Sequence, residues 1–401
     1  MHPDADRLWP GPRWALALLL AAMGMLGPFA IDAYLPAFGT MAQVLSASSL
    51  QMQQTLSAFL LGFAVMNLFH GSLADAFGRR PVVLWGLAVF SLASVGCALT
   101  NSINALILMR GLQGLAAGAG MVVSRAIIRD LFAPADAQRV MSQVTIWFGV
   151  APAVAPLVGG WLYVQAGWAS VFWGLAVFGS ALWLLVWRAL PETLPPAHVQ
   201  RFTPGPLLRG YIDMARRPQM LPLVVASGVP FNGMFLYVLA APAFLGTHLQ
   251  LAPTQYFWFF FVNVGGLMAG AWVSGRLAGR VAPERQVRLG FAVVGVASVA
   301  NVVLNSLLAP HVAWALWPVT AYSFGWALLA PVVTLMVLDV VPERRGMAAS
   351  LQAALGAAAN ALVAGLVVPL VMHSTLALAV ASALLAAVGA GCWGWLRRQG
   401  R

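Results

Sequence analysis

The chain has 401 residues, of which 61% are hydrophobic and 8% charged, and its mean hydropathy is +0.84. This composition excludes an ordinary soluble domain, which is about 45–50% apolar and about 25% charged. The formal net charge of +11 does not indicate nucleic-acid binding, because the arginines lie in short segments between apolar runs and form no basic domain. We therefore expect a helical protein embedded in the lipid bilayer.

Apolar runs of about 20 residues recur along the chain, and each is long enough to cross the bilayer's roughly 30 Å hydrocarbon layer as a helix. The first run follows Arg7 and Arg13 and resembles a signal peptide, but we interpret it as a retained span because eleven similar runs follow. The twelve predicted spans are residues 14–38, 52–71, 81–100, 103–124, 140–163, 168–189, 221–246, 254–275, 288–308, 312–338, 346–371 and 374–396.

The charged residues support this number of spans. Every second connection, starting with the first, contains no Arg, Asp or Glu, whereas the connections between them carry arginines. By the positive-inside rule the arginine-bearing connections are cytoplasmic, so both termini are predicted to lie in the cytoplasm. The longest connection divides the spans six and six. We predict an N-terminal six-helix bundle at 1–189, a cytoplasmic linker at 190–220 and a C-terminal six-helix bundle at 221–401.

A charged segment, GSLADAFGRR, separates the second and third predicted spans at residues 71–80. We predict a short loop whose glycines allow a tight turn and whose Asp75 pairs with arginines or caps neighbouring helix amides. A loop that only set the topology would explain Arg79 and Arg80 but not Asp75 or the glycine spacing. A degenerate counterpart, GRLAGRVAPER, occupies residues 275–285 in the equivalent connection of the second half.

This segment resembles the second-to-third-span motif of the major facilitator superfamily, G-x-L-a-D-r-x-G-r-k. Ala76 stands where the motif has a basic residue, and the matching residues are Gly71, Leu73, Asp75, Gly78, Arg79 and Arg80. The resemblance implies an all-α membrane fold of twelve transmembrane helices in two bundles, a transporter and not an enzyme, and a cytoplasmic gate built on this motif. The expected partners of the motif are Arg125, Arg129 and Asp130.

Only two charged residues fall well within predicted spans, Asp32 in the first and Arg110 in the fourth. A charge near the bilayer centre costs about 2.5–3.5 kcal/mol on insertion scales, so such residues usually have a use. Both are predicted to lie in the outer half of the membrane. One hypothesis makes Asp32 the protonatable carboxylate and Arg110 its modulator, and the alternative is a fixed ion pair that specifies helix packing.

The fourth predicted span places Arg110, Gln113 and Gly114 on one helix face. This pattern resembles the fourth-span motif of proton-coupled members of the superfamily, in which the arginine is linked to proton transfer. In the fifth span, Pro156, Gly159 and Gly160 resemble an element of the antiporter branches, although alanines replace its two leading glycines. Small residues beside a proline would let that helix pack closely and pivot, and ordinary small-residue packing is the alternative.

Three further stretches resemble the Bcr/CflA drug-resistance branch of the superfamily. They are IDAYLP at residues 31–36, RAIIRD at 125–130 and LPETLP at 190–195. The resemblance implies a proton-coupled antiporter of the bacterial inner membrane that exports small lipophilic compounds or antibiotics by alternating access.

Superfamily members line their cavity chiefly with the first, fourth, seventh and tenth spans. The candidate cavity residues on these spans are Phe29, Gln113, Asn232, Phe235, Tyr322 and Trp326. Aromatic walls with one carboxylate would suit neutral or cationic lipophilic compounds, although such residues also serve helix packing.

Three other interpretations remain. The first is an exporter or importer of a specific metabolite, such as a nucleoside or amino acid, and the second is a facilitator without proton coupling. A membrane-embedded enzyme has no support, because the sequence lacks H-E-x-x-H, a nucleotide-binding glycine loop and a nucleophile elbow. We expect a monomer without metal or cofactor, whose partners are a small-molecule substrate, protons and the lipid bilayer.

Overall fold

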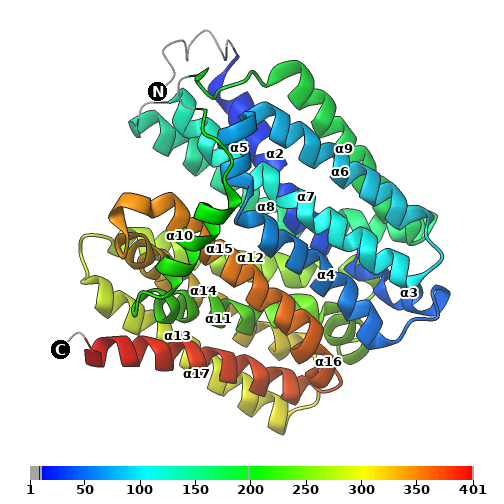
Figure 1. Cartoon of the computed structure of the whole chain (residues 1–401). Helices are drawn as coiled ribbons and strands as arrows, with labels where there is room; N and C mark the ends of the chain where they lie inside the picture. The colour runs from blue at the N-terminus through cyan, green and yellow to red at the C-terminus, as the bar shows by residue number, and fades with distance from the viewer. Residues whose placement is uncertain (1–8, 10, 133, 197–198, 400–401) are drawn as a thin grey trace. The chain divides into compact units, whose positions relative to one another are not determined.

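The structure is a computed structural model that describes residues 9, 11–132, 134–196 and 199–399 (Figure 1). Within these residues all regular structure is helical. The α-helices are α2 (Arg13–Asp32), α3 (Phe38–Val44), α4 (Ser49–Asn67), α5 (His70–Phe77), α6 (Arg79–Leu99), α7 (Ile103–Leu131), α8 (Pro134–Ala166), α9 (Ala169–Ala189), α10 (Pro204–Ala215), α11 (Met220–Leu239), α12 (Phe257–Leu277), α13 (Pro283–Leu307), α14 (Val312–Asp339), α15 (Arg345–Leu362), α16 (Val368–Val371) and α17 (Thr375–Gln399). The 3-10 segments are η1 (Leu35–Ala37), η4 (Pro253–Gln255) and η5 (Pro342–Arg344), and the π-helical segments are η3 (Pro242–His248) and η6 (Val363–Val367).

The described residues contain ten helices that are long and apolar enough to cross a membrane, and the bent pair α4–α5 makes an eleventh candidate. The fifth predicted span, residues 140–163, falls in α8, which contributes the apolar stretch Val150–Ala166. Several predicted spans consist of an α-helix continued by a 3-10 or π segment, as in the first, seventh and eleventh. The all-α, multi-span architecture predicted from the sequence is confirmed.

The chain divides into two compact units, Met1–Pro204 and Gly205–Arg401. In the first unit, the fourth span α7 packs against α2, α4 and α6, which are its first, second and third spans. In the second unit, α14 packs in the same way against α11, α12 and α13. The fourth span thus has equivalent neighbours in both units, as expected of an internal repeat of six helices.

Small residues allow the close helix contacts of the first unit. A Cβ atom at Gly114 of α7 would overlap the carbonyl oxygen of Phe59 in α4. A Cβ at Gly159 of α8 would likewise overlap the carbonyl oxygen of Ala33, which follows α2. Because lipid tails are as apolar as the side chains, close packing of this kind replaces the hydrophobic effect as the force that joins membrane helices.

The segment 71–80 differs from the predicted loop. After α4 ends, the axis bends by 49° and the chain continues as the helix α5, so that most of the predicted loop is helical. Only Gly78, with a φ of +97°, separates α5 from α6. The prediction was wrong because the two glycines suggested a turn between them, whereas the residues from Ser72 to Phe77 contain no helix breaker and one positive-φ glycine reverses the chain.

The predicted linker 190–220 has two distinct parts. The residues that follow α9 bond to the first unit through Glu192 and Thr193, as described below. The amphipathic helix α10 packs on the second unit, where Gly210 approaches the side chain of Met347. The boundary between the two units falls between these parts, at residues 204 and 205.

Candidate functional site

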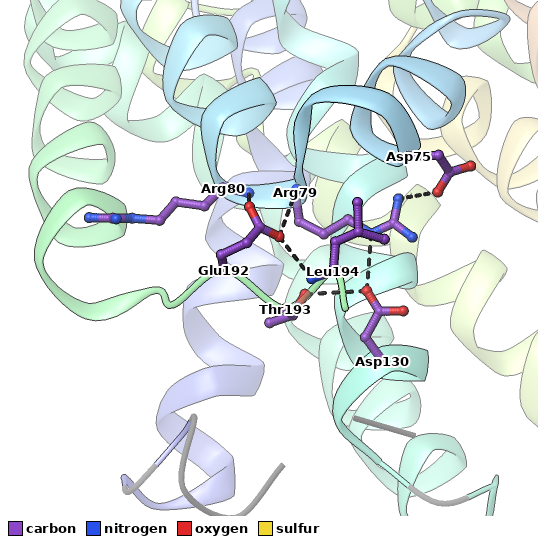
Figure 2. Close-up of polar contacts among 7 residues, drawn as sticks. All are labelled: Asp75, Arg79, Arg80, Asp130, Glu192, Thr193 and Leu194. Atoms are coloured by element: carbon purple, nitrogen blue, oxygen red, sulfur yellow. Dashed lines mark hydrogen bonds and ion pairs between the residues drawn. The ribbon is translucent and has the colours of Figure 1, made fainter. Parts of the chain in front are cut away.

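The motif at the start of α6 is organised around the side chain of Arg79 (Figure 2). Its Nη1 donates a hydrogen bond to Asp75 Oδ1, four residues earlier, and its Nε donates to Asp130 Oδ2 of α7 at 3.0 Å. The Arg79 side chain is 7% exposed, while both carboxylates are half-buried. The predicted pairing of Asp75 with an arginine of the motif is therefore confirmed, and Asp130 is the partner contributed by α7.

The other predicted partners of the motif do not join this cluster. Arg125 and Arg129 are exposed on α7 and form no ion pair or hydrogen bond with any described residue. All three charged residues were predicted as partners because they lie near the end of the fourth span, beside the motif. In a helix, however, residues 126, 127, 130 and 131 lie on a different side from 125 and 129, so only Asp130 faces α6.

Glu192 completes the cluster from the segment after α9 (Figure 2). Its Oε1 accepts a hydrogen bond from the backbone N–H of Arg79 at 3.0 Å, and its Oε2 accepts one from the N–H of Arg80 at 3.1 Å. The two backbone N–H groups lie in the first turn of α6 and have no partner within the helix, and Gly78 has no side chain that could cap them. A carboxylate at this position also interacts favourably with the helix dipole.

Gly78 is required here on two grounds. Its φ of +97° and ψ of 154° lie in a region that is essentially restricted to glycine. In addition, a Cβ atom at residue 78 would lie 2.5 Å from Glu192 Oε2. The glycine that ends α5 therefore also makes room for the carboxylate that caps α6.

Two further bonds tie this cluster to neighbouring helices. Thr193 Oγ1 donates to Asp130 Oδ2 at 3.2 Å, and the Arg80 guanidinium donates to the carbonyl oxygen of Trp187 near the end of α9. The sequence analysis missed the role of Glu192. The signal that could have revealed it is the start of α6 at Gly-Arg-Arg, which has no Ser, Thr, Asp or Asn at the capping position and so needs a remote acceptor.

Arg110 lies at the centre of the first unit and is completely buried. Its Nη1 donates to the carbonyl oxygen of Ala30 in α2 at 3.1 Å and to Gln113 Oε1 at 2.8 Å. The guanidinium lies against the rings of Tyr34 and Phe59, with its carbon 4.4 and 4.5 Å from the two ring centroids. Cation–π contacts of this kind stabilise a charge that water cannot reach.

Gln113 extends this arrangement to α6, because its Nε2 donates to Ser94 Oγ at 2.7 Å. Arg110 and Gln113 thus share one helix face, as predicted, and together they contact α2 and α6. The Nε and Nη2 atoms of Arg110 have no hydrogen-bond partner among the described residues. The guanidinium thus has two donors that are buried and not hydrogen-bonded to described residues.

Asp32 is the last residue of α2 and is 4% exposed. It forms no ion pair or hydrogen bond with any described residue, including Arg110. This contradicts the alternative of a fixed Asp32–Arg110 ion pair, because Arg110 is held instead by a carbonyl, an amide and two rings. Burial of an ionised carboxylate without a partner is energetically unfavourable.

The fifth-span motif lies beside Asp32. Pro156, Gly159 and Gly160 are buried in α8, and Gly159 faces the backbone of Ala33, the residue after Asp32. The predicted close packing by this helix is therefore present. Its role as a pivot stays a prediction.

The candidate cavity residues of the second unit gather between α11 and α14. The ring of Phe231 stacks on Phe235 at 5.3 Å and contacts Trp326 at 4.9 Å. Trp326 Nε1 donates to the carbonyl oxygen of Ser227 at 2.9 Å, and Tyr322 OH donates to that of Pro230 at 2.7 Å. Phe235 and Trp326 are half-buried, so they keep aromatic surface free for a ligand.

The remaining candidates are placed differently. Asn232 is fully buried, its Nδ2 donates to the carbonyl oxygen of Gly228 at 3.1 Å, and its Oδ1 has no partner. Phe29 is half-buried in the first unit, against the ring of Phe178 at 5.5 Å. The sequence analysis did not identify Gln352 of α15, whose Nε2 donates to Ser227 Oγ and Thr334 Oγ1, each at 3.1 Å. Gln352 is the only amide in a stretch rich in alanine, so no helical spacing of polar residues marks it as a candidate in the sequence.

Comparison with known proteins agrees with this architecture. A family model described as Major Facilitator Superfamily matches residues 17–364. The chain belongs to the major facilitator superfamily. The crystal structure of a mutant of the peptide transporter POT matches this superfamily member with a TM-score of 0.76 at 17% identity, covering 96% of this chain and 94% of that one. This likeness shows the shared fold.

Two relatives of this superfamily member carry drug-resistance names. The bicyclomycin resistance protein homolog of Haemophilus influenzae is 30% identical over 277 residues, which is 69% of each chain. Multidrug resistance protein D of Escherichia coli is 27% identical over 346 residues, or 84% of each chain. The resemblance to the drug-resistance branch is thereby confirmed, and the protein is a multi-pass membrane transporter and not an enzyme.

Proposed function

We propose that this transporter exports small lipophilic compounds, including antibiotics, in exchange for protons across the bacterial inner membrane. The observation that carries the proposal is Asp32, a buried carboxyl without an ion-pair partner, in the same unit as the buried Arg110, whose guanidinium has two donors without a hydrogen-bond partner. A carboxyl in this position can load and release a proton without breaking an existing salt bridge. The drug-resistance names of the relatives support the substrate class.

The coupling step follows from these two residues. With Asp32 protonated, Arg110 stays bonded to Ala30 and Gln113, as the structure has it. When the Asp32 O–H bond breaks and the proton passes to water, the resulting carboxylate becomes the stronger acceptor for the free Nε and Nη2 of Arg110. Movement of the end of α2 toward α7 would then distinguish the two protonation states.

Proton entry supplies the energy for export. One proton that crosses 100 mV inward releases about 2.3 kcal/mol, which supports roughly fifty-fold accumulation at equilibrium. We propose alternating access of the two six-helix bundles, with both termini and the Arg79 cluster on the cytoplasmic side, and a monomer as the working unit. The aromatic group Phe231, Phe235 and Trp326 would bind the apolar part of the substrate.

The test is transport by Asp32→Asn in everted membrane vesicles. We expect this variant to lose substrate-dependent proton release while keeping its expression, its monodisperse behaviour and its substrate binding. Asp339→Asn is the control, because Asp339 is an exposed carboxylate that pairs with Arg345 at 2.8 Å. Full proton-coupled export by Asp32→Asn would refute the assignment of Asp32.

A specific metabolite, such as a nucleoside or amino acid, is the second candidate substrate. The buried, unpartnered Oδ1 of Asn232 and the polar group formed by Ser227, Thr334 and Gln352 favour it, because a polar ligand needs hydrogen-bonding partners inside the protein. Binding of a panel of antibiotics and metabolites to the purified protein, read as a thermal shift, separates the two candidates.

A further inference from the structure

A groove of about 540 Å³ lies on the second unit between α13 and α14. The small side chains of Ala297, Ala300 and Ala321 leave it hollow, and the larger side chains of Val296 and Trp317 stand beside them. None of the candidate cavity residues lines this groove. It is therefore separate from the aromatic group between α11 and α14.

The groove opens on the outer surface of two membrane-spanning helices. Val296 is 72% exposed and Trp317 is 65% exposed, and α13 and α14 are both long and apolar enough to cross a membrane. The exposed apolar face of such a span contacts the acyl chains of the bilayer. The groove is thus continuous with the lipid-facing surface of the transporter.

The length of the groove matches one leaflet of the bilayer. Its lining residues on α13 extend from Ala292 to Leu304, a rise of about 18 Å along the helix axis. The hydrocarbon layer is about 30 Å thick, so one leaflet contributes about 15 Å. Leu304 lies close to the end of α13 at Leu307, so the groove runs from the membrane surface toward the midplane.

The walls of the groove are almost entirely apolar. The lining side chains are alanine, valine, leucine, proline and tryptophan, and the indole N–H of Trp314 already donates to the carbonyl oxygen of Ala309 at 3.2 Å. A polar metabolite or antibiotic needs several hydrogen-bonding partners in its site, which these walls do not provide. An acyl chain needs none.

A polar group lies at the surface end of the groove. The ring centroid of His311 lies 4.8 Å from that of Trp314, one of the lining residues. His311 Nδ1 accepts a hydrogen bond from the backbone N–H of Ala313 at 3.1 Å, which leaves the proton of the neutral ring on Nε2. Because His311 is exposed, this N–H can donate to the phosphate of a lipid headgroup.

We propose that the groove binds one acyl chain of a phospholipid, whose phosphate accepts a hydrogen bond from His311 Nε2. The apolar walls, the length of the groove and the donor at its surface end match the parts of a phospholipid in order. A second copy of the chain fits less well. Membrane helices associate through small residues that let their backbones approach, whereas the exposed Val296 and Trp317 keep another helix away from the alanines. The site depends neither on the direction of transport nor on proton coupling.

Photo-crosslinking of the purified full chain tests the groove. The probe is a phosphatidylethanolamine with a diazirine in one acyl chain, added at a low molar ratio in excess detergent so that loosely associated lipid is dispersed. We expect residues 293–304 of α13 to be labelled several-fold more than residues 85–92 of α6, although Trp85 and Leu92 are 73% and 72% exposed. Mass spectrometry of the peptides measures this ratio.

Ala321→Phe should remove the excess labelling, because the phenylalanine ring fills the groove from an exposed position on α14. Ala271→Phe is the matched control, since Ala271 is an exposed alanine of α12 that does not line the groove. If Ala321→Phe does not fold, Ala292→Phe places the same ring in the groove from an exposed position on α13 and must show the same loss.

Equal labelling of the two wild-type stretches, or unchanged labelling in the groove-filling variant, would overturn the proposal. Displacement of the probe by an exported antibiotic would assign the groove to the substrate, and crosslinks between two copies of the chain at the groove would assign it to a dimer; either result also overturns it. If the protein exports no antibiotic, the proposed function fails while the labelling still decides the groove.

His311→Asp tests the headgroup contact, because aspartate can still accept the N–H of Ala313 but repels a phosphate. We expect labelling by the phospholipid probe to fall several-fold, while labelling by a diacylglycerol with the same diazirine chain, which has no phosphate, stays at the wild-type level. His373→Asp, at another exposed histidine, is the control. Unchanged labelling by the phospholipid, or an equal loss with both probes, would overturn the contact between His311 and the phosphate.

Discussion

The second-to-third-span connections of the two units have similar sequences but different interactions. In the first unit, Arg79 bonds to two carboxylates, and Glu192 caps the helix that it begins. In the second unit, residues 275–285 join α12 to α13, and Arg280, Glu284 and Arg285 are exposed without ion pairs to described residues. Arg276 lies 4.6 Å from the ring of Trp272. Among the described residues, only the first connection forms an electrostatic cluster, so the two connections are not equivalent in their interactions.

The starts of α6 and α13 explain part of this difference. Helix α13 begins with Pro283 and Glu284, so one orphan N–H is missing and a local carboxylate lies in the first turn. Helix α6 begins with two arginines and takes its carboxylate from a segment 113 residues away. The start of α6 therefore takes its capping carboxylate from the segment after α9, whereas the start of α13 has a carboxylate within its own first turn.

Replacement of Arg79 should give the largest effect of any change in these connections. Arg79→Ala leaves Asp75 and Asp130 without their shared cation, and loss of one partner of a buried pair costs about 3–5 kcal/mol. We expect a value near the lower end, because both carboxylates are half-buried and water screens them. The exposed Arg280→Ala in the second unit should change stability by less than about 0.5 kcal/mol. Thermal unfolding of both variants in detergent measures the difference, and equal shifts would contradict the comparison.

The first-unit cluster could be predicted only in part. Asp75 and Arg79 are four residues apart, and their pairing follows from helical spacing once α5 is known to be a helix. Glu192 could not be placed, because a capping carboxylate needs no periodic relation to the helix that it caps. The helix α5 was not predicted for a similar reason. The glycines near its two ends suggest a turn, and only the structure shows that the residues between them are helical.

Arg110 shows a different limit. Its burial and its contact with Gln113 follow from its position in an apolar span and from helical spacing. Its other partners do not, because a buried arginine in a sequence suggests an acidic partner, and Asp32 was the only candidate within a span. The structure uses a carbonyl and two aromatic rings instead. With 43 aromatic residues in the chain, counting 21 Phe, 16 Trp and 6 Tyr, sequence alone cannot select Tyr34 and Phe59 as the two that contact it.

The two connecting glycines give a second, smaller test. Gly78→Ala should destabilise the protein by about 2–3 kcal/mol, because its φ of +97° is strained for alanine and its methyl group would meet the Glu192 carboxylate. Gly279→Ala has a φ of +73° but no atom within 4 Å of the new Cβ, so it should cost only about 1 kcal/mol of backbone strain. The difference between the unfolding midpoints of the two variants measures the combined cost of the Glu192 contact and of the more restricted backbone at residue 78. Identical midpoints would mean that Glu192 does not hold its place against residue 78.

The smallest effect should come from replacing Glu192 or Glu284 by glutamine. Comparison of the two variants isolates the contribution of Glu192 to the capping of α6. Glu192→Gln keeps one hydrogen-bond acceptor but removes the charge that faces the N-terminus of α6, a loss of about 1 kcal/mol. Local opening at Arg79 and Arg80 should then be about five-fold more frequent, which hydrogen exchange of these amides measures. Glu284→Gln removes an exposed charge at the start of α13, where Pro283 has no N–H donor, and should change hydrogen exchange there far less.

Equal acceleration of hydrogen exchange at the two helix starts would show that the segment after α9 does not stabilise the start of α6. A selective effect at α6 would mean that any movement of the chain after the sixth span is transmitted to the Arg79 cluster through two hydrogen bonds, a connection that the second unit lacks.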